Sequence, residues 1–370
     1  MFTFRQRIFQ FDWLLLSVVF VLTAVGLAAI YSVDLSRGGP LSLFPTQVTA
    51  LLIGLVALLV AGSTHITVYQ SSAKIAYIVG FLLLIAVLIF GQSIRGTTGW
   101  FRVAGFSFQP VEFAKVSLIL FLASWIHRYN RRFRSWQFLV STGFFTLVYM
   151  GLVMLQPDLG SALILGSVWV GLLALAGTKK RYLLGMIGLV ALAGTAGWFF
   201  LFEDYQKDRL RTFVNPEAYA SNEGYNVVQS IIAIGAGRLT GRGLGFGSQS
   251  QLHFLPEAQT DFIFSVIGEE LGFIGALILL TLYILLLWRL IRIALLCKND
   301  FAAFFVLGVA VMISVQVFIN IGGTTGLLPV TGVTLPFVSY GGSSLIMNLL
   351  LIGIAQSMAV ATNRNSGFEL

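Results

Sequence analysis

Long apolar runs separated by short polar segments are the dominant pattern along this chain. A membrane-spanning helix needs roughly 20 mostly apolar residues. Ten runs come close to that length, so the sequence predicts an all-α polytopic membrane protein with about ten transmembrane helices. They are expected near residues 12–33, 44–62, 72–91, 110–127, 137–155, 160–177, 182–202, 262–288, 301–322 and 342–361.

The composition supports a membrane protein. Of the 370 residues, 57% are hydrophobic and 10% are charged, and the mean hydropathy is +0.89. A soluble domain does not need that much apolar surface. The single cysteine, Cys297, cannot form an internal disulfide, and no Cys/His cluster indicates a zinc site. We therefore expect residues 1–370 to form one membrane domain.

Basic residues in short loops predict the orientation, because cytoplasmic loops carry an excess of Lys and Arg. The segments HRYNRRFR (127–134) and TKKRY (178–182) are therefore placed inside. An even number of spans puts both termini on that side as well. The loops at 34–43, 92–109, 203–261 and 323–341 then face outward. The net charge of +8 is explained by these loops and indicates no nucleic-acid partner.

The outer loop 203–261 is the largest polar segment. Within it, VVQSIIAIGAG (227–237) is too short to span a membrane and predicts a helix lying at the interface. The glycines that follow, in GRLTGRGLGFG (237–247), allow tight turns and close approach of a substrate. They are not a nucleotide-binding fingerprint, because Phe246 stands where the third glycine is required and no apolar strand precedes.

Asp261 stands where this loop turns into the eighth apolar run. A carboxylate at an outer membrane surface, beside a loop rich in hydrogen-bonding groups, suggests chemistry on a lipid-linked substrate. A helix cap is the alternative, because Asp is favoured at helix starts. The residues by themselves leave both interpretations open.

Several charged residues fall within the apolar runs, where each costs a few kcal/mol unless it is paired. Glu112 and Lys115, in QPVEFAKVSLIL, share one helical face and can pair, either to fix helix packing or to line a cavity. Asp158, in QPDLGSALIL, lies in the very short outer turn between two predicted spans and is expected to be a helix-start cap or a turn residue. The adjacent Glu269 and Glu270 point in different directions, so at least one faces protein; pairing with Lys or Arg and cation binding both remain open.

Two further segments carry candidate chemistry. Trp100 and Arg102 lie in an outer loop, where Trp is a common membrane anchor and Arg a plausible phosphate ligand. The uncharged loop LLPVTGVTLPFVSYGGSSL (327–345) predicts ordered non-helical backbone. Such backbone is tolerated at membrane depth only where it is buried in protein or lines a water-filled cavity. Its hydroxyls, Ser339 among them, could line a site or satisfy the loop's own backbone.

Together these segments resemble the SEDS family, the shape, elongation, division and sporulation proteins typified by RodA and FtsW, over nearly the whole chain. The strongest matches are GYNVVQSIIAIGAGRLTGRGLGFGSQSQLHFLPEAQTDFIFSVIGEELGFIG, FSFQPVEFAK, QPDLGSALIL and GLLPVTGVTLPFVSYGGSS. The run QSQLHFLPE looks more like the RodA, or elongation, branch. The chain departs from the family at Gly99, often basic or polar, at Val111, often Ser, and at Thr334, often Pro.

The resemblance implies a peptidoglycan glycosyltransferase that polymerises lipid II at the outer face of the bacterial cytoplasmic (inner) membrane, during cell elongation and shape maintenance. It implies as partners lipid II, a polyprenyl-pyrophosphate-linked glycan, a class B penicillin-binding protein and other membrane proteins of the elongation machinery. The aspartate matching Asp261 is the essential acid of the family. The residues matching Trp100, Glu112 and Lys115 are also functionally implicated.

An inverting transfer would need one base, for which Asp261 is the catalytic candidate, and positive charge near the leaving pyrophosphate. A divalent cation (Mg²⁺ or Mn²⁺) could share the second task, but no ligand set is visible, and no metal site or cofactor is assigned. Alternatives are a lipid II flippase and a scaffold that recruits a transpeptidase. The substrate-binding candidates are Trp100, Arg102, Glu112, Lys115, Arg209, Arg238, Gln249, Glu257 and Ser339, with Arg211 and Arg242 as further pyrophosphate ligands.

Overall fold

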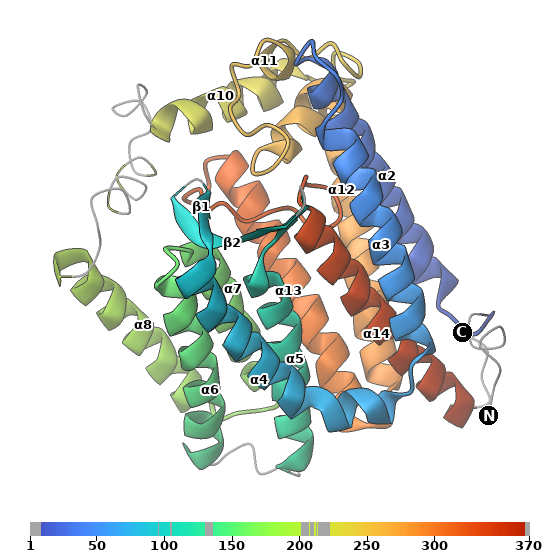
Figure 1. Cartoon of the computed structure of the whole chain (residues 1–370), viewed down its shortest axis with the longest axis vertical. Coiled ribbons are helices and arrows are strands. Elements are labelled where there is room, and N and C mark those ends of the chain that lie inside the picture. The colour runs from blue at the N-terminus through green and yellow to red at the C-terminus, as the bar shows by residue number, and fades with distance from the viewer. Residues whose placement is uncertain are drawn as a thin grey trace.

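The chain folds into a bundle of long helices, seen in the computed structural model (Figure 1). The structure describes residues 9–94, 96–103, 106–129, 136–200 and 223–366, together with 207, 211 and 213. Helix α2 begins and α14 ends at the same end of the bundle (Figure 1), as an even number of spans requires. Which end faces the cytoplasm stays a prediction.

Each of the ten predicted spans corresponds to a helix. Eight of the described helices are long and apolar enough to cross a membrane, and α7, with 17 residues, and α8 complete the ten. The bounds are α2 (Trp13–Leu35), α3 (Leu43–Ser63), α4 (Ile66–Phe90), α5 (Pro110–Arg128), α6 (Trp136–Met154), α7 (Leu159–Leu175), α8 (Lys180–Phe200), α12 (Ile263–Leu296), α13 (Asp300–Thr324) and α14 (Gly342–Ser366).

Two helices extend well beyond the predicted spans. Helix α4 begins at Ile66, after His65 caps it by accepting a hydrogen bond from the backbone N–H of Thr67. Its first turns are polar, so a pattern of apolar residues does not detect them. Helix α12 continues to Leu296, past Arg289 and Arg292, and Arg289 forms a buried ion pair with Asp12 at 2.6 Å.

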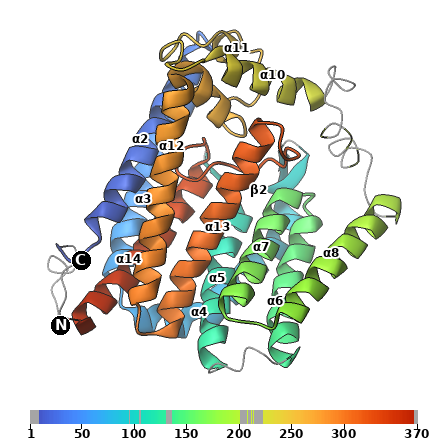
Figure 2. The same ribbon diagram turned by 180° about the vertical axis from the view of Figure 1, so that it is seen from behind.

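Helix α5 occupies the centre of the bundle. Figure 2 shows α13 beside α5 and α7 when the molecule is seen from behind. In α5, 83% of the most apolar stretch is buried inside the protein, against 28% in α4 and 33% in α6. Because nearly every face of α5 is covered, Glu112 and Lys115 are buried within the protein and do not face lipid.

A small antiparallel sheet lies between α4 and α5, where the sequence predicted only a loop. It has the order β1 (Gln92–Ile94), β2 (Thr97–Val103) and β3 (Phe106–Phe108). Trp100 on β2 lies opposite Gln92 on β1, and Arg102 lies opposite Ser107 on β3. β1 and β3 have three residues each, and the seven residues of β2, TTGWFRV, do not alternate between polar and apolar, so the sequence pattern does not predict a sheet.

The predicted short helix is confirmed as α10 (Glu223–Ala236), which lies across one end of the bundle beside α11 (Ser248–Gln251) (Figure 1). The glycine-rich segment between them packs onto a kink in α12 at Gly272, where φ is +67°. A Cβ at Gly272 would overlap the backbone nitrogen of Gly241. This close approach therefore requires glycine.

Glu269 and Glu270 hold the same segment in place. The Glu269 carboxylate accepts hydrogen bonds from the backbone N–H groups of Gln249 (2.8 Å) and Ser250 (3.1 Å). The Glu270 carboxylate accepts from the Ser32 hydroxyl and from the backbone N–H of Gly245. Both carboxylates are buried in protein, and they fasten the loop that precedes α12 to that helix.

Candidate active site

The central feature is a cavity of about 540 Å³. Its wall is formed by the sheet, the starts of α5, α7 and α14, part of α13, and the non-helical segment 325–341. Five charged side chains from distant parts of the chain line it: Arg102, Glu112, Lys115, Asp158 and Asp261. A membrane protein brings so many charges together only where they serve a purpose.

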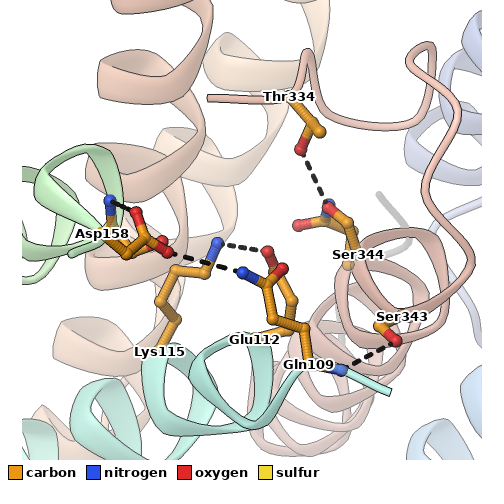
Figure 3. Close-up of polar contacts among 9 residues, drawn as sticks. Gln109, Glu112, Lys115, Asp158, Thr334, Ser343 and Ser344 are labelled. Atoms are coloured by element: carbon orange, nitrogen blue, oxygen red, sulfur yellow. Dashed lines mark hydrogen bonds and ion pairs between the residues drawn. The ribbon is translucent and has the colours of Figure 1, made fainter. Parts of the chain in front are cut away.

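Glu112 and Lys115 form the predicted ion pair. Helix α5 begins at Pro110, whose fixed φ suits a first helical turn. The Lys115 Nζ donates to Glu112 Oε1 at 2.8 Å, and their side chains are 3% and 8% exposed (Figure 3). Both residues line the cavity as well. The pair therefore presents a buried ammonium and carboxylate to the cavity.

Asp158 connects α7 to α5. Its Oδ1 accepts from the backbone N–H of Ser161 at 2.9 Å, which confirms the predicted helix cap. Its Oδ2 accepts from Gln109 Nε2 at 3.4 Å (Figure 3). The backbone N–H of Gln109 in turn donates to the Ser343 hydroxyl, which donates to the Ser107 carbonyl. This network joins β3, α5, α7 and α14 around the cavity.

Asp261 precedes α12, and Phe262 takes the helix-cap position. Asp261 therefore lies one residue before the N-cap position of α12. Its backbone carbonyl accepts a hydrogen bond from Asn320 Nδ2 at 2.9 Å, and the same nitrogen donates to the Val333 carbonyl at 2.8 Å. Asn320 on α13 thus fixes the Asp261 segment against the segment 325–341. The partly exposed Asp261 side chain faces the cavity.

The segment 325–341 is ordered and non-helical, as predicted. The Tyr283 hydroxyl donates to the Pro336 carbonyl at 2.6 Å, deep in the protein. The Ser339 hydroxyl donates to the Thr260 carbonyl and accepts from the backbone N–H of Leu335. Ser339 is buried by these contacts and does not line the cavity. Its hydroxyl supports the backbone around Asp261.

Trp100 and Arg102 are the other predicted residues that line the cavity. Trp100 is half-buried and Arg102 is exposed. Both lie on β2, and the pairing of Arg102 with Ser107 fixes where its backbone stands relative to the start of α5. The sheet that the sequence did not predict is therefore what positions these two side chains.

Three of the remaining candidates lie away from the cavity. Gln249 contacts Glu269 through its backbone, and Glu257 accepts hydrogen bonds from Gln259 Nε2 and the Thr260 hydroxyl. Arg238 is exposed in a turn, where its φ is +49°. None of Gln249, Glu257 and Arg238 lines the cavity. Arg209 lies outside the described residues.

The two further arginines are also away from the cavity wall. The Arg211 guanidinium lies 5.8 Å from the centre of the Trp198 ring. The exposed Arg242 donates to the Ser248 hydroxyl at 2.7 Å. Within the part of the chain that the structure describes, no group of three or more His, Cys, Asp or Glu side chains could hold a metal ion.

Comparison with known proteins shows which family this chain belongs to. The family model FTSW_RODA_SPOVE, described as cell cycle protein, matches residues 8–364. The chain is 38% identical to peptidoglycan glycosyltransferase MrdB of Escherichia coli K12, covering 98% of this chain and 96% of that protein. It is 37% identical to the probable peptidoglycan glycosyltransferase FtsW of Trichlorobacter lovleyi, covering 94% and 93%.

A solved structure agrees in fold. A chain of a peptidoglycan synthase complex, in which polymerization and crosslinking are structurally coordinated, superposes with a TM-score of 0.81. The two chains are 32% identical, and the match covers 95% of this chain and 98% of that one. This chain therefore belongs to the FtsW, RodA and SpoVE family of cell cycle proteins, the SEDS family that its motifs predict.

Proposed function

We propose that this peptidoglycan glycosyltransferase polymerises lipid II in the cavity and that Asp261 is its general base. One observation carries the proposal: a carboxylate, Asp261, and two cations, Lys115 and Arg102, line a single cavity. A glycosyl transfer from a pyrophosphate needs an acceptor for one proton and positive charge for the leaving group. The cavity supplies both.

The reaction is one displacement. A sugar hydroxyl of lipid II attacks the anomeric carbon of the growing glycan, and the new glycosidic C–O bond forms. The bond from that carbon to the pyrophosphate oxygen breaks, and its electron pair leaves with the pyrophosphate. The hydroxyl proton passes to the Asp261 carboxylate. Inversion turns an α-linked donor into a β-linked polymer without a covalent enzyme intermediate.

The cations act on the leaving group. Arg102 is exposed on β2 and can present its planar guanidinium to phosphate oxygens. Lys115 is 3% exposed and forms an ion pair with Glu112. Because its ammonium lies in a region of low dielectric, it stabilises a developing anion strongly. Trp100, half-buried in the same wall, offers an apolar face to a sugar ring.

The site is proposed to face outward from the cytoplasmic membrane, and the chain is proposed to act in cell elongation. Short basic loops at the opposite end of the chain's spans support this orientation. A class B penicillin-binding protein is the proposed partner, because a chain of the same fold occurs in a peptidoglycan synthase complex that couples polymerization to crosslinking.

The test is polymerisation of labelled lipid II by the purified chain, with and without a class B penicillin-binding protein, read as a ladder of glycan lengths on a gel. We expect ladders from samples that contain the chain and none when it is omitted. Lipid II that crosses vesicle membranes without being polymerised would instead identify a flippase. Recruitment of the partner without either activity would identify a scaffold.

Asn320 gives a further prediction. Asn320→Leu removes the two hydrogen bonds to the carbonyls of Asp261 and Val333, so the Asp261 segment loses its anchor to α13. Misplacement by about 1 Å can cost about 10²-fold in rate. We expect kcat for polymerisation to fall about 10- to 100-fold, with a smaller change in KM for lipid II. A wild-type kcat in the folded variant would contradict this role.

A further inference from the structure

Helix α13 carries two buried amides one turn apart, Gln316 and Asn320. Residues four apart lie on one face of a helix. Gln316 is 1% exposed and Asn320 is 5% exposed. The Asn320 nitrogen is bound to two backbone carbonyls. The Asn320 Oδ1 and the Gln316 Oε1 both lack a hydrogen-bond partner among the described residues. Of the two residues, only Gln316 lines the large cavity.

An unpartnered buried amide is costly. Leaving such a group without a hydrogen bond costs about 1–3 kcal/mol, and an apolar side chain of the same shape would avoid that cost. Gln316 lines the cavity together with Glu112, Lys115 and Asp261. A ligand in the cavity is therefore in a position to satisfy this amide.

We propose that Gln316 binds the substrate sugar through an acetamido group. An acetamido group has one N–H donor and one carbonyl acceptor, and the Gln316 amide offers the complementary pair. Rotation about the last side-chain bond, which is soft, turns either atom toward a ligand. The proposal rests on the proposed function, because it assumes that the cavity takes an N-acetylated sugar.

The position of Gln316 supports this role. On α13 it stands one turn from Asn320, which fixes the Asp261 segment, and it shares the cavity wall with the Glu112–Lys115 pair. A sugar held there would share the cavity with the proposed base, Asp261, and with the Lys115 ammonium. A site built to hydrogen-bond one group of a substrate discriminates strongly against an analogue that lacks it.

The test uses Gln316→Met, which keeps the side-chain length and removes the amide. We expect KM for lipid II to rise at least tenfold. We also expect the melting temperature of the substrate-free protein to stay the same or rise, because an unpaired buried amide is removed. An amide that only supports the fold would give the opposite pattern, a lower melting temperature and an unchanged KM, and that result would overturn the proposal.

Gln356→Leu is the matched control. Gln356 is fully buried, and its amide is satisfied, because Nε2 donates to the Asp12 carbonyl at 3.0 Å and Oε1 accepts from the Asp12 N–H at 2.7 Å. By helical rise it lies roughly 20 Å along α14 from the cavity. Gln356→Leu should lower the melting temperature and leave KM unchanged.

Direct binding separates this proposal from the proposed function. Labelled lipid II is titrated into wild type and Gln316→Met, together with an analogue in which the acetamido groups are replaced by hydroxyls. We expect wild type to prefer lipid II over the analogue and Gln316→Met to lose that preference. If both proteins discriminate equally, a water molecule satisfies the amide and the proposal fails. If the wild-type protein prefers lipid II over the analogue but forms no glycan, the proposed sugar-binding site stands and only the proposed polymerase function is refuted.

Discussion

Asp261→Asn is expected to lower kcat for glycan polymerisation by about 10²–10⁴-fold, the usual contribution of a general base. The amide is of nearly the same size, but it cannot take the proton of the attacking hydroxyl. The hydrogen bond from Asn320 reaches the backbone carbonyl of Asp261 and is unaffected by the change. Affinity for lipid II should therefore stay within a few-fold of wild type, measured by titration of the labelled substrate.

Asp34→Asn is the control for this prediction. Asp34 is 1% exposed, and its Oδ2 accepts hydrogen bonds from the backbone N–H groups of Ser42, Leu43 and Phe44 at the start of α3. It does not line the cavity. Its substitution should cost about 1 kcal/mol of stability and leave the rate per folded molecule unchanged. A wild-type kcat in Asp261→Asn would exclude Asp261 as the base.

Lys115→Met is expected to destabilise the protein by about 3–5 kcal/mol, because it leaves the Glu112 carboxylate buried without its partner. The pair is 2.8 Å apart and nearly inaccessible to solvent. Thermal unfolding of the purified protein in detergent measures the loss. The free energy of unfolding should fall much more than in exposed substitutions, which usually change it by less than about 0.5 kcal/mol.

The double variant Glu112→Gln with Lys115→Met separates stability from function. It leaves no unpaired charge, so we expect it to recover most of the lost stability. Polymerisation should stay low, because the cavity still lacks the buried ammonium. If the double variant regained wild-type polymerisation, the pair would be a packing element and not part of the site. If Lys115→Met alone were as stable as wild type, Glu112 would have to be solvated.

The helical bundle could be predicted from the sequence because membrane spans are set by local hydrophobicity over roughly 20 residues. The ion pair between Glu112 and Lys115 could also be predicted, because charged residues within apolar helices need partners. The family resemblance also indicated Asp261 and Trp100, and the residue type indicated Arg102 as a phosphate ligand. All three line the cavity. These predictions depend on local pattern or on motif, and neither requires knowledge of tertiary contacts.

The remaining features depend on long-range contacts that a pattern does not contain. The three-stranded sheet shows no alternation of polar and apolar residues in its sequence, yet it positions Trp100 and Arg102. Ser339 looked like a site hydroxyl, but it binds the Thr260 carbonyl. Gln316 was overlooked inside an apolar helix, although a buried amide at membrane depth is the same kind of signal as a buried charge.

The claim that Asp261 acts as a base in one displacement is tested most directly on the wild-type enzyme. The protein is quenched during turnover with labelled lipid II, digested, and the peptides that contain Asp261 are analysed by mass spectrometry. The account predicts unmodified Asp261 while β-linked glycan accumulates. A glycosyl ester on the Asp261 carboxylate, formed and consumed at the rate of polymerisation, would contradict it and make Asp261 a nucleophile.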